Sequence, residues 1–589
     1  MTVTTPIRRR PTDAAPGFAA DLHPIVRRAY AARGLRSDDE LDLSLHRLLP
    51  IGSLPGVDAA AQLLARHRAA GRVLVVGDFD ADGATSSALM VRALRAMRFA
   101  HVDFLVPNRF RYGYGLTPEI VALAAERAPT LIVTVDNGVS SIEGVEAARS
   151  LNVAVLVTDH HLPGATLPRA DAIVNPNLAG STFASPALAG VGVAFYVVAA
   201  LARLVEQPGF HAADLLDLVA LGTVADVVPL DRNNRVLVAQ GLRRIRAGRC
   251  VPGIRALLAG AGRQIERITA ADLGFAVGPR LNAAGRLTDM SVGIACLLAD
   301  DPLAAERLAE QLSALNAERR QIERRMQLEA VDFAAAIDAT AAGAAPLGLC
   351  LFDESWHQGV VGLVAGRIKD RLHRPVIAFA RAADGSLRGS ARSVAGVHIR
   401  DALESIAVRH PGLLEKFGGH ALAAGLTLNG EQLPAFRTAF AAEIALRADP
   451  DSLAGVIHSD GELSRAEICL DTARALRGAG PWGQGFPEPV FDGAFDIVET
   501  RVVGEKHLKF KVRAAPADAH GADPPGDAGA SGPASARTFD AIAFGYVGGV
   551  AEDRAVRAGV RVELAYRLEI NDYDGTERVQ LNCEHLRAL

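Results

Sequence analysis

Paired cysteines are missing from this chain of 589 residues. Its cysteines occur singly, so no two have the short spacing of a zinc site, and scattered thiols do not make a disulfide framework. This usage is typical of a reducing compartment, and we expect a cytoplasmic protein. The five are Cys250, Cys296, Cys350, Cys469 and Cys583.

Long apolar runs are missing as well. No run reaches the ~20 apolar residues that a membrane span requires. The nearest stretch, Ala187 to Ala202, contains Gly190 and Gly192 and is closed by Arg203, which favours a buried helix. No apolar signal-peptide core follows the N-terminal residues. We therefore expect no association with a membrane.

The chain also lacks a strong charge imbalance, since its formal net charge is -4. Nucleic acid is still an acceptable partner, because a basic groove can hide in a near-neutral total. With 49% hydrophobic and 22% charged residues, the chain can bury sizeable cores. At ~150 residues each, its length predicts about three or four domains.

Apolar runs alternate with helical stretches from about residue 70 onward. This alternation predicts a parallel sheet covered on both faces by helices. In such sheets, ligands bind beyond the carboxyl ends of the strands. The expected strands are 72–76, 102–106, 131–135 and 153–157, and the expected helices are 84–97, 117–127 and 141–150.

Acidic residues and histidines follow these runs. The first run leads into GDFDADG at 77–83, where three carboxylates repel one another unless a cation lies among them. Taken alone, this segment is equally well explained as a solvated turn. However, Asp136-Asn137-Gly138 and Asp159-His160-His161 end two further runs, and Asp226 follows a predicted helix at 218–224. Hard carboxylates with one or two imidazoles suit Mn²⁺ or Mg²⁺.

Taken in order, these motifs resemble those of the DHH phosphoesterase family. Further segments are similar to the branch of that family that degrades single-stranded DNA from its 5′ end, and the resemblance spans nearly the whole chain. It implies an α/β multidomain fold: a parallel-sheet DHH domain, a long connecting helix, a smaller α/β DHHA1-type domain and a C-terminal OB-like β-barrel. The further matching segments are 107–116, 278–286, 356–362, 389–393, 417–421 and 481–489.

The expected domain boundaries combine the resemblance with the patterns. A helical lead-in covers 1–50, the DHH domain 51–300, the connecting helix 301–343, the DHHA1-type domain 344–450 and the OB-type domain 451–589.

The resemblance further implies a centre for two divalent ions, Mn²⁺ or Mg²⁺. Asp78 either binds an ion or holds a ligand in place, and His161 either orients a ligand or donates to the phosphate. The sequence does not separate these roles. The implied metal ligands are Asp78, Asp80, Asp82, Asp136, His160 and Asp226, and the implied catalytic residues are Asp80, Asp82, Asp136, His160, His161 and Asp226.

A second set of residues is implied to bind DNA and its phosphates. Arg280, Ser390 and Arg392 are candidates for a 5′ phosphate. Tyr114 either stacks on a base or packs within its loop. Gly418 and Gly419 are expected to precede a helix at 421–425, whose N-terminus would attract an anion. The full set is Arg109, Tyr114, Arg280, Asn282, Ser390, Arg392, Gly418, Gly419 and His420.

The connecting segment begins with Asp301-Pro302, a helix-start signal, and has no glycine or further proline until Gly343. We expect a helix of nearly forty residues. Its arginines alternate with glutamates, which is typical of a solvated face, although they could also line a cleft for a DNA strand. They are Arg319, Arg320, Arg324 and Arg325.

Five short alternating runs after residue 490 predict a small barrel of the oligonucleotide-binding type. They are interrupted at 514–537 by a segment rich in Pro, Gly, Ala and Asp, for which we expect a disordered insert. Lys506, Lys509, Lys511 and Arg513 are expected to form a basic strand face for a DNA backbone.

The implied activity is metal-dependent hydrolysis of single-stranded DNA from 5′ to 3′, releasing mononucleotides, by a monomer that acts in recombination and repair. A single-strand-binding protein and a helicase are partners by resemblance only. Three alternatives stay open: a phosphodiesterase for oligonucleotides or cyclic dinucleotides (or a pyrophosphatase), a non-catalytic DNA-binding scaffold, and a dehydrogenase. The sequence argues against a dehydrogenase, because this chain has no glycine-rich dinucleotide motif after its first predicted strand.

Overall fold

The chain folds into two compact units in a computed structural model. The first comprises Ser44–Gly455, and the second combines Thr5–Leu43 with Val456–Leu589. Among the described residues, no single helix is long and apolar enough to cross a membrane, and only the bent pair Leu45–Ser53 and Val57–Arg66 reaches that length and composition. The structure describes residues 6–11, 17–108, 112, 114–340, 346–448, 453, 455–504, 507–515, 537–545, 556–572 and 575–589.

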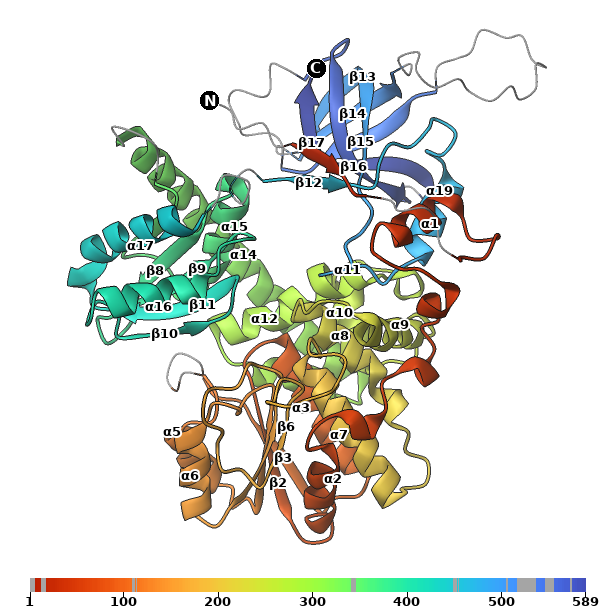
Figure 1. The fold of residues 1–589 in the computed structure, drawn as a ribbon. Coiled ribbons are helices and arrows are strands. Elements are labelled where there is room, and N and C mark those ends of the chain that lie inside the picture. Colours follow the sequence, from red (N-terminus) through yellow and green to blue (C-terminus); the bar gives the residue numbers. More distant parts are fainter. Residues whose placement is uncertain are drawn as a thin grey trace. The chain divides into compact units, whose positions relative to one another are not determined.

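A parallel sheet lies at the centre of the first unit, in the strand order β3-β2-β4-β5-β6. The four predicted strands are confirmed, and a short fifth strand, β6, was not predicted. Helices cover both faces: α5 (Pro118–Ala125) and α6 (Ile142–Ser150) lie on one side, and α2 (Val57–Arg66) and α7 (Gly190–Val205) on the other (Figure 1). The strands are β2 (Arg72–Gly77), β3 (His101–Leu105), β4 (Leu131–Val135), β5 (Ala154–Thr158) and β6 (Ala172–Val174).

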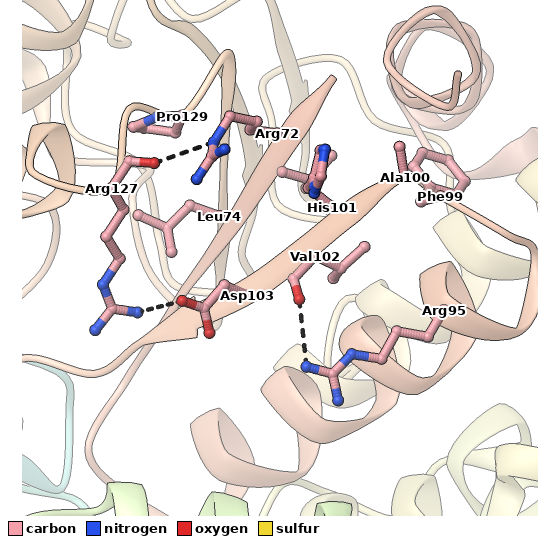
Figure 2. A pocket seen from close by; sticks show the side chains of 11 residues that line it. Arg72, Leu74, Arg95, Phe99, Ala100, His101, Val102, Asp103, Arg127 and Pro129 are labelled. Carbon is pink, nitrogen blue, oxygen red and sulfur yellow. Dashed lines mark hydrogen bonds and ion pairs between the residues drawn. The ribbon is translucent and has the colours of Figure 1, made fainter. Parts of the chain in front are cut away.

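The outer edge of β3 is capped by side chains around a hollow of about 390 Å³ (Figure 2). Arg95 Nη2 donates to Val102 O at 3.3 Å, and Arg127 Nη1 donates to Phe104 O at 2.5 Å. Asp103 accepts from the N–H of Phe104 at 2.8 Å and pairs with Arg127 at 2.9 Å. Backbone groups that an edge strand would offer to another strand are therefore occupied.

Helices α8 to α13 follow the sheet in the chain; α8 packs on α3 (Ala81–Ala96), and α10, α12 and α13 pack on α14. The apolar segment before Arg203 is the buried helix α7, as predicted. Short loops connect the remaining helices, and a π-helical turn, η6, precedes α12. They are α8 (Leu216–Ala225), α9 (Arg232–Arg246), α10 (Pro252–Gly260), α11 (Ala270–Asp272), η6 (Leu273–Val277), α12 (Gly278–Leu287) and α13 (Ser291–Leu298).

The predicted long helix is α14 (Pro302–Thr340), with 39 residues. The prediction of a solvated arginine face is wrong for Arg319, because this residue is buried. Its guanidinium bonds Glu323 Oε2 at 2.5 Å and Asn316 Oδ1 at 2.8 Å, because burying a charge requires such partners. Arg320, Arg324 and Arg325 are exposed.

The second domain of this unit is a five-stranded sheet in the order β10-β11-β9-β8-β7. The expected helix at 421–425 is wrong, because this segment turns into strand β11, which pairs with β9 and β10. The apolar side of β11 completes the domain core through Ala424, Leu426 and Leu428. The elements are β7 (Leu349–Phe352), α15 (Val361–Leu372), β8 (Val376–Arg381), β9 (Leu387–Arg392), α16 (Ile399–Arg409), β10 (Lys416–Gly419), β11 (Ala423–Leu428) and α17 (Leu433–Arg447).

The second unit contains the predicted barrel, closed in the order β13-β14-β15-β17-β16. All five predicted strands are present. The strand face that we expected to be basic carries charges of both signs, because Lys511 pairs with Glu499 at 2.9 Å. Lys506 and nearly all of the insert at 514–537 lie outside the described residues. The strands are β13 (Phe491–Val503), β14 (His507–Ala514), β15 (Phe539–Ala543), β16 (Arg561–Asn571) and β17 (Arg578–Ala588).

The N-terminal segment belongs to this second unit and is not purely helical. Helix α1 (Pro24–Ala31) is present, but strand β1 (Ile7–Arg9) pairs in parallel with β12 (Ile457–Ser459). Arg33 donates to the buried carboxylate of Asp460, with Nη1 at 2.8 Å from Oδ1. The two ends of the chain thus build one unit.

Candidate metal centre and phosphate site

The loop at 77–83 connects β2 to α3 (Ala81–Ala96) and carries three carboxylates. Asp80 is the N-cap of α3, and its Oδ1 accepts from Gly83 N at 3.0 Å. Asp78 is buried and accepts from Phe79 N at 2.7 Å. A side chain at Gly83 would collide with the Asp78 backbone, with its Cβ at 2.5 Å from Asp78 O. Glycine there allows the tight turn that brings the carboxylates together.

Asp82 is fully buried and faces the N-terminus of α7. Its Oδ2 accepts from Gly190 N at 2.7 Å and its Oδ1 from Val191 N at 2.9 Å. Backbone N–H groups at a helix N-terminus stabilise a carboxylate in this way. Gly190 also leaves room for Asp136, since a Cβ there would lie 2.5 Å from Asp136 Oδ1.

Asp136 follows β4 in the left-handed region, with φ 62°. Non-glycine residues adopt this conformation in only a few per cent of cases, and Asp tolerates it better than most. Its backbone N–H still pairs with Thr158 O at 3.0 Å. The sheet thus holds a strained residue whose carboxylate turns toward the loop at 77–83.

The segment after β5 is organised by Asp159, which is buried. Its Oδ1 accepts from His160 N at 2.7 Å and from His161 Nδ1 at 2.8 Å, and its Oδ2 from Val139 N at 2.9 Å. This fixes the ring of His161 and leaves His160 directed at the neighbouring carboxylates. His160 Nε2 lies 3.1 Å from Asp136 Oδ1 and 3.5 Å from Asp226 Oδ2.

Asp226 is the C-cap residue of α8, so it follows a helix, as predicted. The next residue, Val227, has φ 61° and is 63% exposed. A β-branched residue in the left-handed region is strained. The chain therefore turns sharply at the point where Asp226 faces His160.

Three buried atoms in this cluster converge without the geometry of a hydrogen bond: His160 Nε2 lies 3.1 Å from Asp136 Oδ1 and 3.5 Å from Asp226 Oδ2. Unpaired buried polar atoms are costly, and atoms that converge on one point are typical of an ion site. Oxygen donors with an imidazole nitrogen fit Mn²⁺ or Mg²⁺. Three sets of donor atoms lie within 4.8 Å of one another: Asp136, His160 and His161; Asp82, His160 and Asp226; Asp78, Asp80 and Asp136.

The electrostatics of the cluster agree with a site for a cation. Burial and the charges of Asp226 and Asp80 raise the pKa of Asp82 to about 7. Burial and Asp80 raise the pKa of Asp226 to about 7, and burial with the neighbouring carboxylates raises the pKa of Asp136. Bound cations stabilise the deprotonated forms of such ligands.

His161 differs from His160 in its charge. Burial would lower the pKa of His161, but its bond to Asp159 and the surrounding carboxylates outweigh burial and raise this pKa to about 9. Burial and the charge of His161 lower the pKa of His160. A positive His161 thus lies beside a neutral His160, which is the form that binds a metal.

Tyr114 and His420 contact His161 from two sides. The Tyr114 hydroxyl donates to Asp136 O at 3.2 Å, and its ring meets that of His161 edge-on at 5.6 Å. The ring of His420, which follows β10, stacks on His161 at 5.9 Å and 22°. The second sheet therefore reaches the metal centre through His420. Tyr114 packs against His161 and remains 48% exposed.

Ser390 and Arg392 share one side of β9, as their spacing predicted. Arg392 Nη1 donates to Ser390 Oγ at 3.1 Å. Both lie against the N-terminus of α15, since a Cβ on Gly362 would be 2.8 Å from Ser390 Oγ and 3.0 Å from Arg392 Nη2. A helix N-terminus suited to an anion is therefore present, and it belongs to α15 rather than to the segment after Gly419.

The comparisons with known proteins agree with this layout. Residues 72–223 match the DHH family, N-terminal domain, residues 344–446 the DHHA1 domain, and residues 459–521 the RecJ OB domain. The single-stranded-DNA-specific exonuclease RecJ of Dickeya dadantii (strain 3937) is 52% identical over 599 aligned positions, covering 100% of both chains. The chain belongs to the RecJ family.

Two solved RecJ structures from Thermus thermophilus are similar to this chain. The one in complex with Mn²⁺ has a TM-score of 0.77 at 31% identity, over 96% of this chain and 76% of that one. The one in complex with Mg²⁺ has a TM-score of 0.71 at 30% identity, over 96% and 75%. The α/β fold with DHH, DHHA1 and OB domains is confirmed.

Several residues expected to bind DNA have other contacts in this RecJ-family chain. Asn282 Oδ1 accepts from Ala81 N at 2.8 Å, so it supports the loop at 77–83. Arg280 Nη1 donates to Ala276 O at 2.5 Å and its Nε to Ser313 Oγ at 3.2 Å, on the side of α12 that faces α14. Gly419, with φ 143°, lets β10 turn into β11. Arg109 lies outside the described residues.

Residues that support the centre were not predicted individually. Asp159 was recognised only as part of a motif, and Gly190 only as a residue disfavouring a membrane span. Gly285 lies where a Cβ would be 1.8 Å from Phe79 O, so α12 also approaches the loop at 77–83. These roles depend on contacts between distant segments, and no local pattern marks them.

Proposed function

We propose that this chain is a metal-dependent exonuclease that removes mononucleotides from the 5′ end of single-stranded DNA during recombination and repair. The observation that carries the proposal is the convergence of Asp136 Oδ1, His160 Nε2 and Asp226 Oδ2 without hydrogen-bond partners. The substrate is taken from relatives named single-stranded-DNA-specific exonuclease.

In this proposal, the carboxylates and His160 hold two divalent ions. Bound ions of this kind lower the pKa of water and stabilise negative charge on phosphoryl oxygens. Besides binding an ion, Asp82 would hold α7 against the centre, because it accepts hydrogen bonds from Gly190 N and Val191 N. Asp78 orients the loop through its bond to Phe79 N, and its carboxylate belongs to one of the three donor sets, so it would either bind an ion or hold a ligand in place. The proposed ligands are Asp80, Asp82, Asp136, His160 and Asp226.

His161 is proposed to donate to the phosphate in the transition state. Its pKa of about 9 keeps the ring positive at neutral pH. Asp159 holds the ring through Nδ1, and the edge of Tyr114 and the face of His420 restrict its rotation. A charged donor held in place in a buried site stabilises developing negative charge without reorganisation.

Ser390, Arg392 and the first turn of α15 are proposed to hold the phosphate next to the scissile bond. The guanidinium and hydroxyl are already bonded to each other at 3.1 Å, which orients both donors. His420 stacks on His161, and its backbone N–H donates to Ala423 O, in the strand that pairs with β9 opposite Arg392. Substrate choice would then come from the second domain and the barrel, and the chemistry from the metal centre.

We also propose, from the resemblance to the family, how the enzyme assembles and which proteins it works with. The enzyme is expected to act as a monomer in the cytoplasm, where its five unpaired cysteines stay reduced. A single-strand-binding protein and a helicase would supply its substrate. Pull-down of these partners with the purified chain, before and after nuclease treatment, tests whether they bind it directly.

Digestion of a single strand labelled at either end tests the function. With Mn²⁺ or Mg²⁺, the 5′ label should appear at once as a mononucleotide, while the 3′ label stays on progressively shorter strands. Chelator, Asp136→Asn and His160→Ala should abolish both signals, and Asp300→Asn, a change of an exposed carboxylate, should not.

Other outcomes would redirect the proposal. Cleavage of dinucleotides but not of long strands would indicate an oligonucleotide phosphodiesterase. Strand binding without cleavage in any metal would indicate a scaffold. Full activity of both Asp136→Asn and His160→Ala would refute the assigned centre.

A further inference from the structure

The hollow beside β3 lies at the amino end of the first sheet. Arg72 at the start of β2 and His101 at the start of β3 line it, and these two residues pair across the strands (Figure 2). The metal centre lies at the opposite end, because β2 runs from Arg72 to Gly77, where the loop at 77–83 begins. At ~3.3 Å per residue, the strand separates the two by ~17 Å. The hollow is therefore distinct from the metal centre.

Three arginines reach this hollow from three elements. Arg72 belongs to β2, Arg127 follows α5, and Arg95 lies in the last turn of α3, on the other face of the sheet. Arg72 Nε donates to Arg127 O at 3.3 Å, and Arg95 Nη2 donates to Val102 O at 3.3 Å. Among the described residues, no group bonds the two terminal nitrogens of Arg72. These nitrogens are therefore available to a ligand.

The hollow has an excess of positive charge. Of the described residues that line it, Asp103 has the only carboxylate, which accepts from Phe104 N at 2.8 Å and pairs with Arg127 at 2.9 Å. In the same described part of the chain, neither Arg72 nor Arg95 pairs with a carboxylate. Positive groups gathered around a hollow attract an anion.

The edge of β3 adds a backbone donor. The N–H and C=O of one strand residue point to the same side, so the N–H of Val102 faces outward with the carbonyl that Arg95 binds. Backbone N–H groups and arginines both bind phosphate oxygens, and arginine can donate two parallel bonds to one phosphate. Leu74 and Pro129, both buried, add apolar surface to the lining.

We infer that this hollow binds a small phosphate-bearing ligand of up to mononucleotide size. The terminal nitrogens of Arg72 and the N–H of Val102 bind the phosphate, and any organic part lies against Leu74 and Pro129. The volume of about 390 Å³ falls in the range of ~300–1,000 Å³ that is typical of ligand sites. The chemistry of the ligand follows from these residues and does not depend on the proposed function, although the mononucleotides that such an enzyme releases share it.

Larger occupants fit this hollow less well. A peptide strand cannot add to β3, because arginine side chains already bond the outward carbonyls of Val102 and Phe104. A single strand of nucleic acid binds largely through aromatic platforms, but Phe99, the phenylalanine in the lining, is only 7% exposed. Charged donors around a hollow of this size instead suit one compact anion.

Anomalous X-ray scattering tests the location of this site. Crystals of the full chain are soaked with 5-iodo-2′-deoxyuridine 5′-monophosphate in chelator, and the iodine is located. We expect an iodine peak in the hollow, with density for the phosphate next to the Arg72 guanidinium. Peaks confined to other places, such as the metal centre, or no peak at all, would overturn the inference.

Calorimetry in chelator tests the chemistry of the ligand. Thymidine 5′-monophosphate, thymidine and inorganic phosphate are titrated into Arg392→Ala, in which the proposed phosphate site at α15 is impaired. The monophosphate should bind at least about 10-fold more tightly than thymidine, because the phosphate carries the recognition. Equal affinities of these two would refute phosphate recognition. Equal binding of the ion and the monophosphate would identify free phosphate as the ligand, and tighter binding of the monophosphate would identify a nucleotide.

Variants of Arg72 give a further arm of the test. In the same background, Arg72→Ala should weaken binding of the monophosphate by about 10- to 100-fold, because it removes charged hydrogen bonds. Arg72→Lys keeps the charge without the paired donors and should retain part of the affinity. Arg66→Ala, a change of an exposed arginine on α2, is the matched control. Unchanged affinity in Arg72→Ala would show that the hollow is not the site.

Failure of this inference is distinguishable from failure of the proposed function. Arg72→Ala should degrade a labelled strand with Mn²⁺ like the wild type, because Arg72 lies ~17 Å from the metal ligands along β2. If the wild type degrades no strand, the proposed function is wrong, and binding in the hollow is still measured in chelator. If Arg72→Ala does not fold, the crystal experiment on the wild type decides alone.

Discussion

Asp82 and Asp226 carry an electrostatic cost that a cation would remove. Their pKa values of about 7 mean that, without metal, the folded protein binds protons near neutrality that the unfolded chain has already released. When folding raises the pKa of a carboxyl group, that group favours the folded state most at a pH below its unfolded pKa of about 4. This contribution to folding stability is lost as the pH rises to about 7.

Asp226→Asn should therefore stabilise the metal-free protein, and more so at pH 8 than at pH 5. Thermal unfolding in chelator at both pH values measures the difference from wild type. With Mn²⁺ at pH 8, the wild type should instead be more stable than Asp226→Asn, because only the wild type has the full set of metal ligands. A difference that does not change with pH would contradict the assignment, and Asp300→Asn is the matched control.

Gly190 is the residue on which two ligands depend. Gly190→Ala would place a Cβ 2.5 Å from Asp136 Oδ1 and so displace that carboxylate. We expect Mn²⁺ affinity, measured by calorimetry, to fall by about 10- to 100-fold, as for other residues that orient metal ligands.

Gly192→Ala is the control for this prediction. The three atoms nearest to its Cβ would all belong to the side chain of Leu188, with Cδ1 at 2.5 Å and Cγ at 2.8 Å, and none to a proposed metal ligand. The variant should bind Mn²⁺ like the wild type. If both alanine variants bind equally well, Gly190 does not position Asp136.

At the scale of elements, the edge of β3 illustrates protection against strand pairing. Arg95 and Arg127 bond the carbonyls of Val102 and Phe104, and Asp103 bonds the N–H of Phe104. The double variant Arg95→Ala/Arg127→Ala should expose this edge and promote association between copies.

Light scattering across a concentration series measures that association. Nuclease activity per folded chain should be retained, because β3 ends in no residue of the metal centre. The control is Arg66→Ala, a change of an exposed arginine on α2. A double variant that stays as dispersed as the wild type would show that the caps are not needed.

The elements also show where sequence reasoning succeeds. The three central strands of the first sheet, β2, β4 and β5, are buried almost throughout. Their continuous apolar runs were therefore recognisable in the sequence, and the acids at their ends identified the metal centre. The hairpin of β10 and β11 was not predictable, because Ala421–Gly425 has the local preference of a helix. Its pairing with β9 depends on a contact that local propensity does not encode.

At the scale of the whole molecule, the N-terminal segment joins the barrel unit. Its parallel pairing with β12 links opposite ends of the chain, and no local signal predicted it. Likewise, Arg280 was expected at the phosphate, but its contacts to Ala276 and Ser313 follow from how α12 meets α14. Motifs identified which residues matter, and packing decided where they point.

Arg33→Ala tests this assembly of the second unit. Arg33 and Asp460 are buried together at 2.8 Å, and removing one partner of a buried pair typically costs about 3–5 kcal/mol. Chemical unfolding followed by Trp482, against which Arg33 packs, measures the loss. Arg465→Ala, an exposed change, is the control, and equal stability of the two variants would contradict the role of Arg33.

Binding of divalent ions between Asp136, His160 and Asp226 is the feature on which the proposed function depends. The most direct measurement is anomalous X-ray scattering at the manganese edge, from crystals grown with Mn²⁺. We expect a peak within coordination distance of Asp136 Oδ1, His160 Nε2 and Asp226 Oδ2, and we expect it to disappear in His160→Ala. Strong anomalous peaks elsewhere, with none at these three atoms, would contradict it.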